Sequence, residues 1–202
     1  MKAQESKAHA SIRLFKSPVL EALTHVHPSV PFLVWVPVVA YQLLQASQVQ
    51  SLVLLILTFL TGVLFWTLTE YSMHRYVFHF KATSKAGQYL VFLFHGIHHD
   101  DPEDPTRLVM PPVVSISLGF VFYYAFQLLL GADSTHAFFS GFIAGYLVYD
   151  YIHYATHHFR PRTAWGKRTK EHHMKHHYLK KGGKWGVSTP LWDHVFGTFK
   201  GE

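Results

Sequence analysis

Ten histidines stand at spacings that favour the binding of transition metals. They form four clusters along the chain: His74 and His79; His95, His98 and His99; His153 and His157; and His173, His176 and His177. Residues three or four positions apart share one face of a helix, so the histidines of the second cluster are expected to converge on a single point. Imidazole is the commonest side-chain ligand of transition metals, and ten such groups exceed the coordination of one ion. The pattern therefore predicts a site for two metal ions.

Residues beside these clusters are candidates to orient the ligands. The candidates are Glu70, Asp150, His158, His172 and Asp193. Glu70 lies four residues before His74, so its carboxylate can accept the second ring N–H of that imidazole, and Asp150 shares a helix face with the third cluster. An ion pair of Glu70 with Arg75 or Lys81 is the alternative.

The donor set favours a metal that reacts with O₂. The chain has no cysteine, which excludes thiolate zinc sites and cysteine-ligated iron–sulfur clusters. Ten imidazoles shared by two ions leave one octahedral position open on each ion, whereas a closed structural zinc site uses four ligands. Two iron ions with O₂ as co-substrate are therefore expected, and zinc can occupy such sites in purified protein.

Two long stretches without charge predict membrane-spanning helices. No Asp, Glu, Lys or Arg stands between Glu21 and Glu70, and Asp133 is the only charged residue between Arg107 and Asp150. Each stretch accommodates two helices of about 20 residues, the length that crosses a hydrocarbon core of roughly 30 Å. Short polar breaks divide each stretch into a helical hairpin. The expected spans cover residues 30–46, 50–69, 111–130 and 136–152.

The charge distribution predicts the orientation of these spans. Neither hairpin turn contains Lys or Arg, so all 18 basic residues fall on the side of the termini, which the positive-inside rule makes cytoplasmic. A bacterial inner membrane or the endoplasmic reticulum is the expected location. Anionic lipid headgroups account for the basic excess, and no nucleic-acid partner is expected.

The histidine clusters begin at or just beyond the cytoplasmic ends of the spans, and a helical bundle brings such ends together. The predicted fold is thus an all-α integral membrane protein. One domain over residues 1–202 places four spans, in two hairpins, beneath a cytoplasmic histidine-rich dimetal-binding cap. His9, His25, His27 and His136 have no partner at ligand spacing and are interpreted as solvent, interfacial or far-side residues.

Four motifs summarise the histidine pattern: His74-x₄-His79, His95-x₂-His98-His99, His153-x₃-His157-His158 and His173-x₂-His176-His177. With them, and with residues 13–21, 31–37, 70–75 and 186–198, the chain resembles the fatty acid hydroxylase superfamily of membrane dimetal oxygenases. Within that superfamily it is most similar to fatty acid 2-hydroxylases that lack a cytochrome b5 domain. Only residues 1–10 fall outside the resemblance.

The resemblance implies that the ten clustered histidines are metal ligands and catalytic residues. It also implies hydroxylation of a long-chain fatty acyl lipid at carbon 2, often a lipid of the sphingolipid pathway. Membrane lipids surround such an enzyme, and electrons come from a separate donor, a cytochrome b5-like protein or a ferredoxin with its reductase. An acyl chain is expected to lie along Phe120, Phe122, Tyr123 and Phe126.

Other functions remain open at the level of the sequence. An acyl desaturase, or a sterol or carotenoid hydroxylase of the same superfamily, has similar histidine motifs and uses the same oxidant. A zinc- or haem-binding membrane protein without catalytic activity is the alternative from another class. Bis-histidine haem would require histidines within facing spans, and residues 30–69 contain none.

Overall fold

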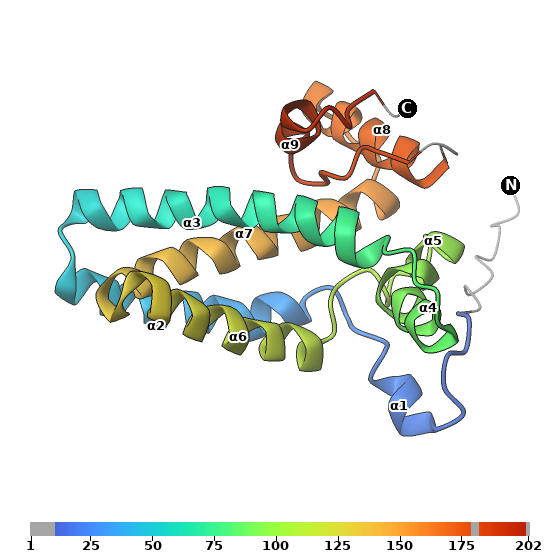
Figure 1. The fold of residues 1–202 in the computed structure, drawn as a ribbon, viewed down its shortest axis with the longest axis horizontal. Coiled ribbons are helices and arrows are strands. Elements are labelled where there is room, and N and C mark those ends of the chain that lie inside the picture. The colour runs from blue at the N-terminus through green and yellow to red at the C-terminus, as the bar shows by residue number, and fades with distance from the viewer. Residues whose placement is uncertain (1–10, 179–181, 201–202) are drawn as a thin grey trace, which may run out of the picture.

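The computed structural model describes residues 11–178 and 182–200, and every regular element in these ranges is helical. Four long helices lie side by side and form a bundle (Figure 1). They are α2 (Val30–Val49), α3 (Leu52–Ser72), α6 (Pro112–Leu130) and α7 (Ala132–His158). Helices α2, α3 and α6 all pack against α7, which is therefore the core of the bundle. The predicted all-α fold is confirmed for the described residues.

Shorter elements gather at and beside one end of this bundle (Figure 1). They are α1 (Pro18–Ala22), η1 (Met73–Phe78), α4 (Lys85–Val91), η2 (Phe92–Gly96), α5 (Ile97–Asp100), α8 (Ala164–Tyr178) and α9 (Leu191–Val195). The segments η1 and η2 are wide, π-helical turns, and each continues directly from or into an α-helix. Nine of the ten clustered histidines lie on these elements or on the end of α7, and His79 follows η1 directly.

Helices α3 and α7 approach each other so closely that glycine is needed between them. A Cβ atom at Gly141 would lie 1.9 Å from the carbonyl oxygen of Phe59, and one at Gly62 would lie 2.1 Å from that of Phe138. Small residues allow backbones to meet in this way, which is how helices associate in lipid, where apolar side chains gain little from burial.

Three of the long helices are long and apolar enough to cross a membrane: α2, α3 together with η1, and α6. Large apolar side chains such as Leu52, Leu57 and Leu128 are exposed on their outer faces. The spans predicted at residues 30–46, 50–69 and 111–130 coincide with these helices. The span predicted at residues 136–152 falls within α7, which is enclosed by the others and carries buried polar groups, so its crossing stays a prediction.

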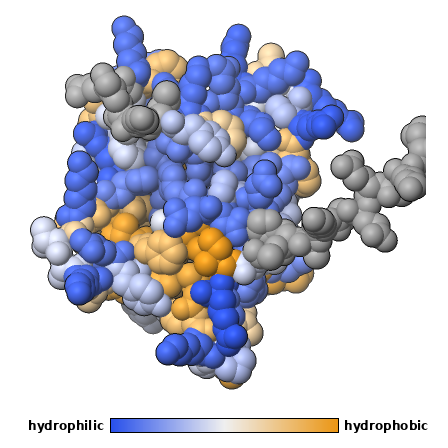
Figure 2. All heavy atoms as spheres, turned by 90° about the vertical axis from the view of Figure 1, so that its right-hand side faces the viewer, coloured by the Kyte–Doolittle hydropathy of each residue, from blue (hydrophilic) through white to orange (hydrophobic). Residues whose placement is uncertain are grey.

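The molecular surface changes character at the end of the bundle near α4 and α5. Figure 2 shows that this end is largely hydrophilic, with one hydrophobic patch in its lower part. The sides of the bundle, in contrast, expose leucine, valine and phenylalanine along α2, α3 and α6. The surface is thus apolar along the sides of the bundle and polar at this end.

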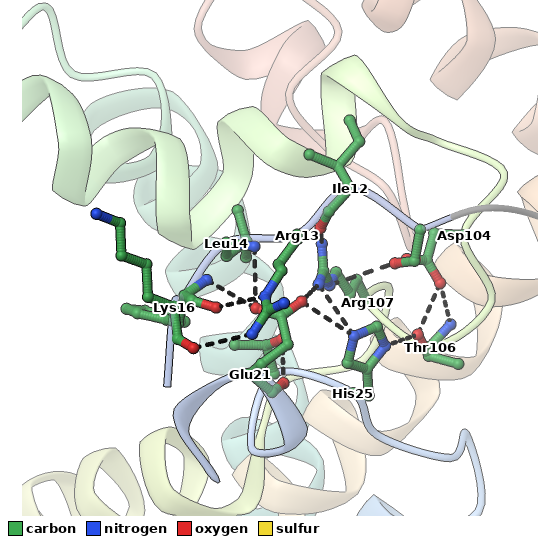
Figure 3. Close-up of polar contacts among 12 residues, drawn as sticks. Ile12, Arg13, Leu14, Lys16, Glu21, His25, Asp104, Thr106 and Arg107 are labelled. Carbon is green, nitrogen blue, oxygen red and sulfur yellow. Dashed lines mark hydrogen bonds and ion pairs between the residues drawn. The ribbon is translucent and has the colours of Figure 1, made fainter. Parts of the chain in front are cut away.

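Arg107 anchors the segment that precedes α2 (Figure 3). Its guanidinium lies 2.5 Å from the carboxylate of Glu21 and also donates to the carbonyl oxygen of Ile12. The second oxygen of Glu21 accepts the N–H groups of Leu14 and Phe15, at 2.9 and 2.7 Å. The N-terminal segment is therefore fixed to the turn that follows α5.

The turn that follows α5 packs against this segment. Asp104 in the turn is buried and accepts hydrogen bonds from Thr106. His25, interpreted from the sequence as a solvent or interfacial residue, is half-buried, and its Nδ1 lies 2.6 Å from Thr106 Oγ1 because residues 12–26 fold back over the turn. His136 bonds Gln42 at the opposite end of the bundle, and His9 lies outside the described residues.

Candidate metal centre

The structure brings the ten clustered histidines together in two groups of five. The first group contains His74, His79, His95, His99 and His176, and the second contains His98, His153, His157, His173 and His177. In each group the ligand nitrogens all lie within 4.8 Å of one another. The two groups are adjacent, since the rings of His99 and His177 stack at 4.2 Å between centroids. The two groups therefore form one candidate site with room for two metal ions, called the double centre below.

The distances between the nitrogens fit metal coordination. Contacts between Nε2 atoms measure 3.1 Å for each of three pairs in the first group and 2.8–3.1 Å for four pairs in the second. With metal–nitrogen bonds of roughly 2.1 Å, neighbouring ligands at right angles lie roughly 3.0 Å apart and opposite ligands roughly 4.2 Å apart. A tetrahedral site would separate them by roughly 3.4 Å. The groups thus fit ions with five or six ligands better than closed tetrahedral zinc.

The π-helical turn η1 explains how His74 and His79 join one group. On an α-helix, residues five positions apart point roughly 140° away from each other. A π-helical turn is wider and closes a hydrogen bond between residues five apart, so such residues return to the same side. His74 lies in η1 and His79 follows it directly, with their rings 5.2 Å apart. Spacing rules for α-helices do not reveal this pairing.

The prediction that His95, His98 and His99 converge on one point is wrong. His95 and His99 belong to the first group, whereas His98 belongs to the second and lies 2.9 Å from His153, between their Nε2 atoms. The reason is geometric, because positions three and four residues along a helix differ by about 100° around its axis. The two flanks of α5 therefore supply different groups.

Helix α8 divides its histidines in the same way. His173 and His177, four residues apart, enter the second group, and His176 enters the first. Each of these two triplets thus contributes to both groups, which holds the groups next to each other.

Burial keeps the imidazoles neutral. Removal from water, reinforced by neighbouring imidazoles, holds the pKa of His95, His98 and His173 well below its usual range. The same burial lowers the pKa of His79 to about 4 and those of His157 and His177 to about 3. A neutral imidazole has a free lone pair, which is the form that binds a metal. The environment therefore favours the ligand state at neutral pH.

Backbone carbonyls orient two ligands of the first group. His74 Nδ1 donates to the carbonyl oxygen of Trp185 at 2.5 Å, and His176 Nδ1 donates to that of Gly183 at 2.9 Å. A carbonyl can only accept, so Nδ1 carries the proton and Nε2 keeps its lone pair for a metal. The ring of Trp185 packs on His79 and His176, at 4.9 and 5.1 Å. The C-terminal segment that carries Trp185 thus folds over the first group.

Asp193 holds this C-terminal segment in place. The carboxylate is fully buried and accepts the N–H groups of Trp185 and Gly186, each at 2.9 Å. It also accepts the hydroxyl of Thr198 at 2.7 Å and faces His172 Nε2 at 3.2 Å. Burial raises the pKa of Asp193, but these hydrogen bonds outweigh it and lower the pKa overall. Both candidates, Asp193 and His172, thus lie in one network that supports the ligand carbonyls.

Glu70 performs a similar function from α3, although neither predicted partner is the one found. Its carboxylate accepts the N–H groups of Val187 and Ser188, at 2.6 and 2.8 Å, together with the Ser188 hydroxyl. It accepts no hydrogen bond from His74, because the Nδ1–H of that ring is already donated to the carbonyl oxygen of Trp185. Glu70 therefore links α3 to the segment that orients the first group.

The second group has a different outer environment. Among the described residues, the Nδ1 atoms of His98, His153 and His173 have no hydrogen-bond partner. Asp150 is buried nearby on α7, and its Oδ2 has no hydrogen-bond partner among the described residues, so its role in orienting a ligand stays a prediction. The ring of His158 packs on that of Tyr154 at a tilt of 37° and 4.6 Å between centroids, and His158 is outside both groups.

An apolar pocket opens beside both groups. It lies between α2, α3, η1, α6 and α7, is lined mainly by apolar side chains and is partly open to the outside. Two wall residues contact ligands: Phe78 stacks on His95 of the first group at 5.3 Å, and Tyr149 stacks on His153 of the second at 5.7 Å. The pocket therefore leads from the double centre into the bundle. An apolar chain in it would be shielded from water with one end beside the imidazoles.

Only part of the predicted acyl path lines this pocket. Phe122 does, whereas Phe120 is 60% exposed on the outer face of α6 and Phe126 packs in the core behind the pocket. Phe120 and Phe122, two residues apart, point to opposite sides of α6, whereas Phe126 lies on the same face as Phe122 one turn further along the helix.

Known proteins match this chain over most of its length. The family model described as fatty acid hydroxylase matches residues 59–198. Dihydroceramide fatty acyl 2-hydroxylase FAH2 of Arabidopsis thaliana is 37% identical over 191 residues, which cover 94% of this chain and 80% of the plant protein. Ceramide very long chain fatty acid hydroxylase scs7 of Schizosaccharomyces pombe is 40% identical over 182 residues, which cover 89% of this chain and 52% of the yeast protein.

A solved structure has the same fold. Full-length scs7p, of which only the hydroxylase domain is visible, matches with a TM-score of 0.88 at 37% sequence identity. The match covers 93% of this chain and 72% of that chain.

Proposed function

The chain belongs to the fatty acid hydroxylase family, and from this premise we propose that it hydroxylates a long-chain fatty acyl lipid at carbon 2. Two of the relatives reported above, one from a plant and one from a yeast, have names that state their reactions. The plant protein is named for 2-hydroxylation of a dihydroceramide fatty acyl chain, and the yeast protein for hydroxylation of very long chain fatty acids in ceramide. A sphingolipid or its acyl precursor is accordingly the proposed substrate.

One observation carries this proposal: two groups of five imidazoles lie beside an apolar pocket, and two wall residues of the pocket stack on ligand rings. Phe78 and Tyr149 join the pocket wall to one ligand of each group. An acyl chain that enters the pocket by its methyl end leaves its first carbons nearest the imidazoles. This orientation brings the carbons near the lipid head to the imidazoles, so we propose oxidation there and not near the methyl end.

We propose that all ten histidines bind two iron ions, five to each ion. Bound iron would supply the activation of O₂ that an unreactive C–H bond requires. The residues of this chain supply the surroundings: burial keeps the imidazoles neutral, and the carbonyls of Trp185 and Gly183 fix the tautomers of two ligands. Electrons are proposed to come from a separate cytochrome b5-like protein, or from a ferredoxin with its reductase.

The proposed topology has four spans, α2, α3, α6 and α7, with both termini and the histidine groups on the cytoplasmic side. The hydrophilic end in Figure 2 and the absence of basic residues from both hairpin turns support this orientation. The membrane is proposed to be a bacterial inner membrane or the endoplasmic reticulum. There the lipid head would remain near the basic residues of the cap while the acyl chain enters the bundle.

Lipid mass spectrometry tests the proposed function. Cells that make no 2-hydroxy acyl lipids of their own would express the chain together with a suitable reductase. The expected products carry a hydroxyl group at carbon 2 and are absent with the His98→Ala variant. A new double bond would identify a desaturase, and hydroxylation in the middle or at the end of the chain would show a different mode of substrate entry. Either result would replace the proposed function.

A further inference from the structure

The pocket ends on a layer of phenylalanine rings. Its deepest wall residues on α6 and α7 are Phe122 and Phe142, whose ring centroids lie 4.8 Å apart. Phe126, Phe138 and Phe65 pack directly beneath them, with neighbouring centroids 4.8–5.8 Å apart. We call Phe65, Phe122, Phe126, Phe138 and Phe142 the aromatic floor. Phe142 lies seven residues from Tyr149 and eleven from His153 on α7, so the floor lies roughly 16 Å along the helix from the nearest ligand of that helix.

Two tight contacts between helices flank the pocket. The contacts at Gly62 and Gly141 seal the seam between α3 and α7, where a single methyl group would collide with a carbonyl oxygen. On the opposite side Trp35 crosses to α6 and lies 2.2 Å from where a Cβ atom at Gly119 would stand. An acyl chain cannot pass at either of these contacts, and the side chains of the floor stand at the end of the pocket between them.

We infer that the aromatic floor sets the length of the acyl chain that this enzyme hydroxylates, with Phe122 and Phe142 as the specificity-determining residues. The inference rests on the proposed function, because it takes the pocket to be the acyl site. When the methyl end of the chain meets the floor, the reacting carbon stays at the imidazoles only for chains that fit the pocket. A longer chain would push that carbon outward, and a shorter chain would leave part of the pocket unfilled.

Phe122 is the better position to test, because it is only partly buried whereas Phe142 is 1% exposed and central to the core. The variant Phe122→Ala should move the product profile to longer chains. Each additional buried methylene favours binding roughly fourfold, so room for two methylenes should change the ratio of long to short products roughly 15-fold. Phe120→Ala is the matched control, since it removes the same side chain two residues away, where it is 60% exposed outside the pocket.

A second variant tests the same inference in the opposite direction. Leu118 lines the pocket one helical turn nearer the imidazoles than Phe122. Leu118→Phe fills space above the floor and should move the profile to shorter chains, even if Phe122→Ala proves too unstable to fold. The experiment supplies acyl chains of graded length to cells that express each variant, and mass spectrometry gives the hydroxylated fraction at each length.

The outcomes separate the two proposals. No 2-hydroxy product from the unmodified chain would end the proposed function, and with it the role of the floor. Product from the unmodified chain, together with an unchanged length profile in active Leu118→Phe and Phe122→Ala, would overturn only the aromatic floor as the determinant. Opposite shifts in these two variants, with none in Phe120→Ala, would establish it.

Discussion

Replacement of Asp193 by asparagine should weaken the first histidine group by an amount that follows from the donors around this carboxylate. Oδ1 accepts the N–H of Trp185 and the hydroxyl of Thr198, and Oδ2 accepts the N–H of Gly186 and faces His172. Asparagine replaces one oxygen with an NH₂ group, which cannot accept a hydrogen bond. The hydroxyl can rotate and the imidazole can change tautomer, but a backbone N–H can only donate. In either orientation of the amide, one buried N–H is left unpaired.

An unpaired buried donor costs about 1–3 kcal/mol, and bonds to a neutral acceptor are weaker than those to a carboxylate. The free energy of unfolding of Asp193→Asn should therefore fall by at least about 1–3 kcal/mol. Asp193→Ala leaves both N–H groups unpaired and should cost about twice as much. Because the same segment carries the carbonyls of Trp185 and Gly183, the metal affinity of the first group should also fall, by roughly 10–100-fold. The second group, which these carbonyls do not touch, should keep its metal.

The assay combines thermal unfolding in detergent with the metal content per chain after dialysis against chelators of increasing strength. Asp133→Asn, an exposed acid at the opposite end of the bundle, is the control and should behave as the unmodified chain does. Loss of one metal before the other, with a lower unfolding midpoint, is the expected result. Equal retention of both metals with an unchanged midpoint in Asp193→Asn would refute the idea that this carboxylate supports the first group.

Three further predictions concern the ligands, the pH dependence and the topology. His98→Ala should abolish hydroxylation and remove one metal per chain, whereas His136→Ala, far from both groups, should change neither; full activity of His98→Ala with replete iron would contradict the ligand assignment. The pKa of His79 falls from 6.5 to about 4 in the folded chain, so the unfolded chain binds more protons between these values. Stability of metal-depleted protein should be intact above about pH 6.5 and decline as the pH falls toward 4, which unfolding midpoints across this range will check. A cysteine at Ser134 should react only with reagent on the non-cytoplasmic side and one at Ser84 only with reagent on the cytoplasmic side, and the reverse labelling would exclude the proposed topology.

Local sequence patterns predicted the parts of the structure that depend on local rules. Uncharged stretches of sufficient length predicted the long helices, because length and hydropathy are properties of a single segment. The ten histidines were identified because metal ligands are recognisable by residue type and spacing. Two groups of five were expected from the number of imidazoles, but the membership of each group was not predicted, since it depends on which flank of α5 and α8 meets which neighbour. The wide turn at η1 was also missed, because no residue type marks a π-helical turn.

Contacts between distant segments account for the remaining errors. The partners of Glu70 are Val187 and Ser188, more than a hundred residues away, while the sequence offered only near neighbours on the same helix. His25 and Arg107 meet for the same reason, through an N-terminal segment that folds back. The backbone carbonyls that orient His74 and His176 could not be predicted from the sequence, because every residue has such a carbonyl. The glycine- and tryptophan-rich character of the C-terminal segment was the only indication that it has a defined structure.

The position of that C-terminal segment has a consequence for biosynthesis. All ten histidines precede residue 178 in the chain, yet the carbonyls and carboxylate that orient the first group come from residues 183–193. Chains are made from the N-terminus and their parts fold in that order. The bundle can therefore enter the membrane with every ligand already present but with His74 and His176 still free to rotate. We therefore expect the first group to bind a metal stably only after translation has passed Asp193, which would make metal loading a late step in maturation.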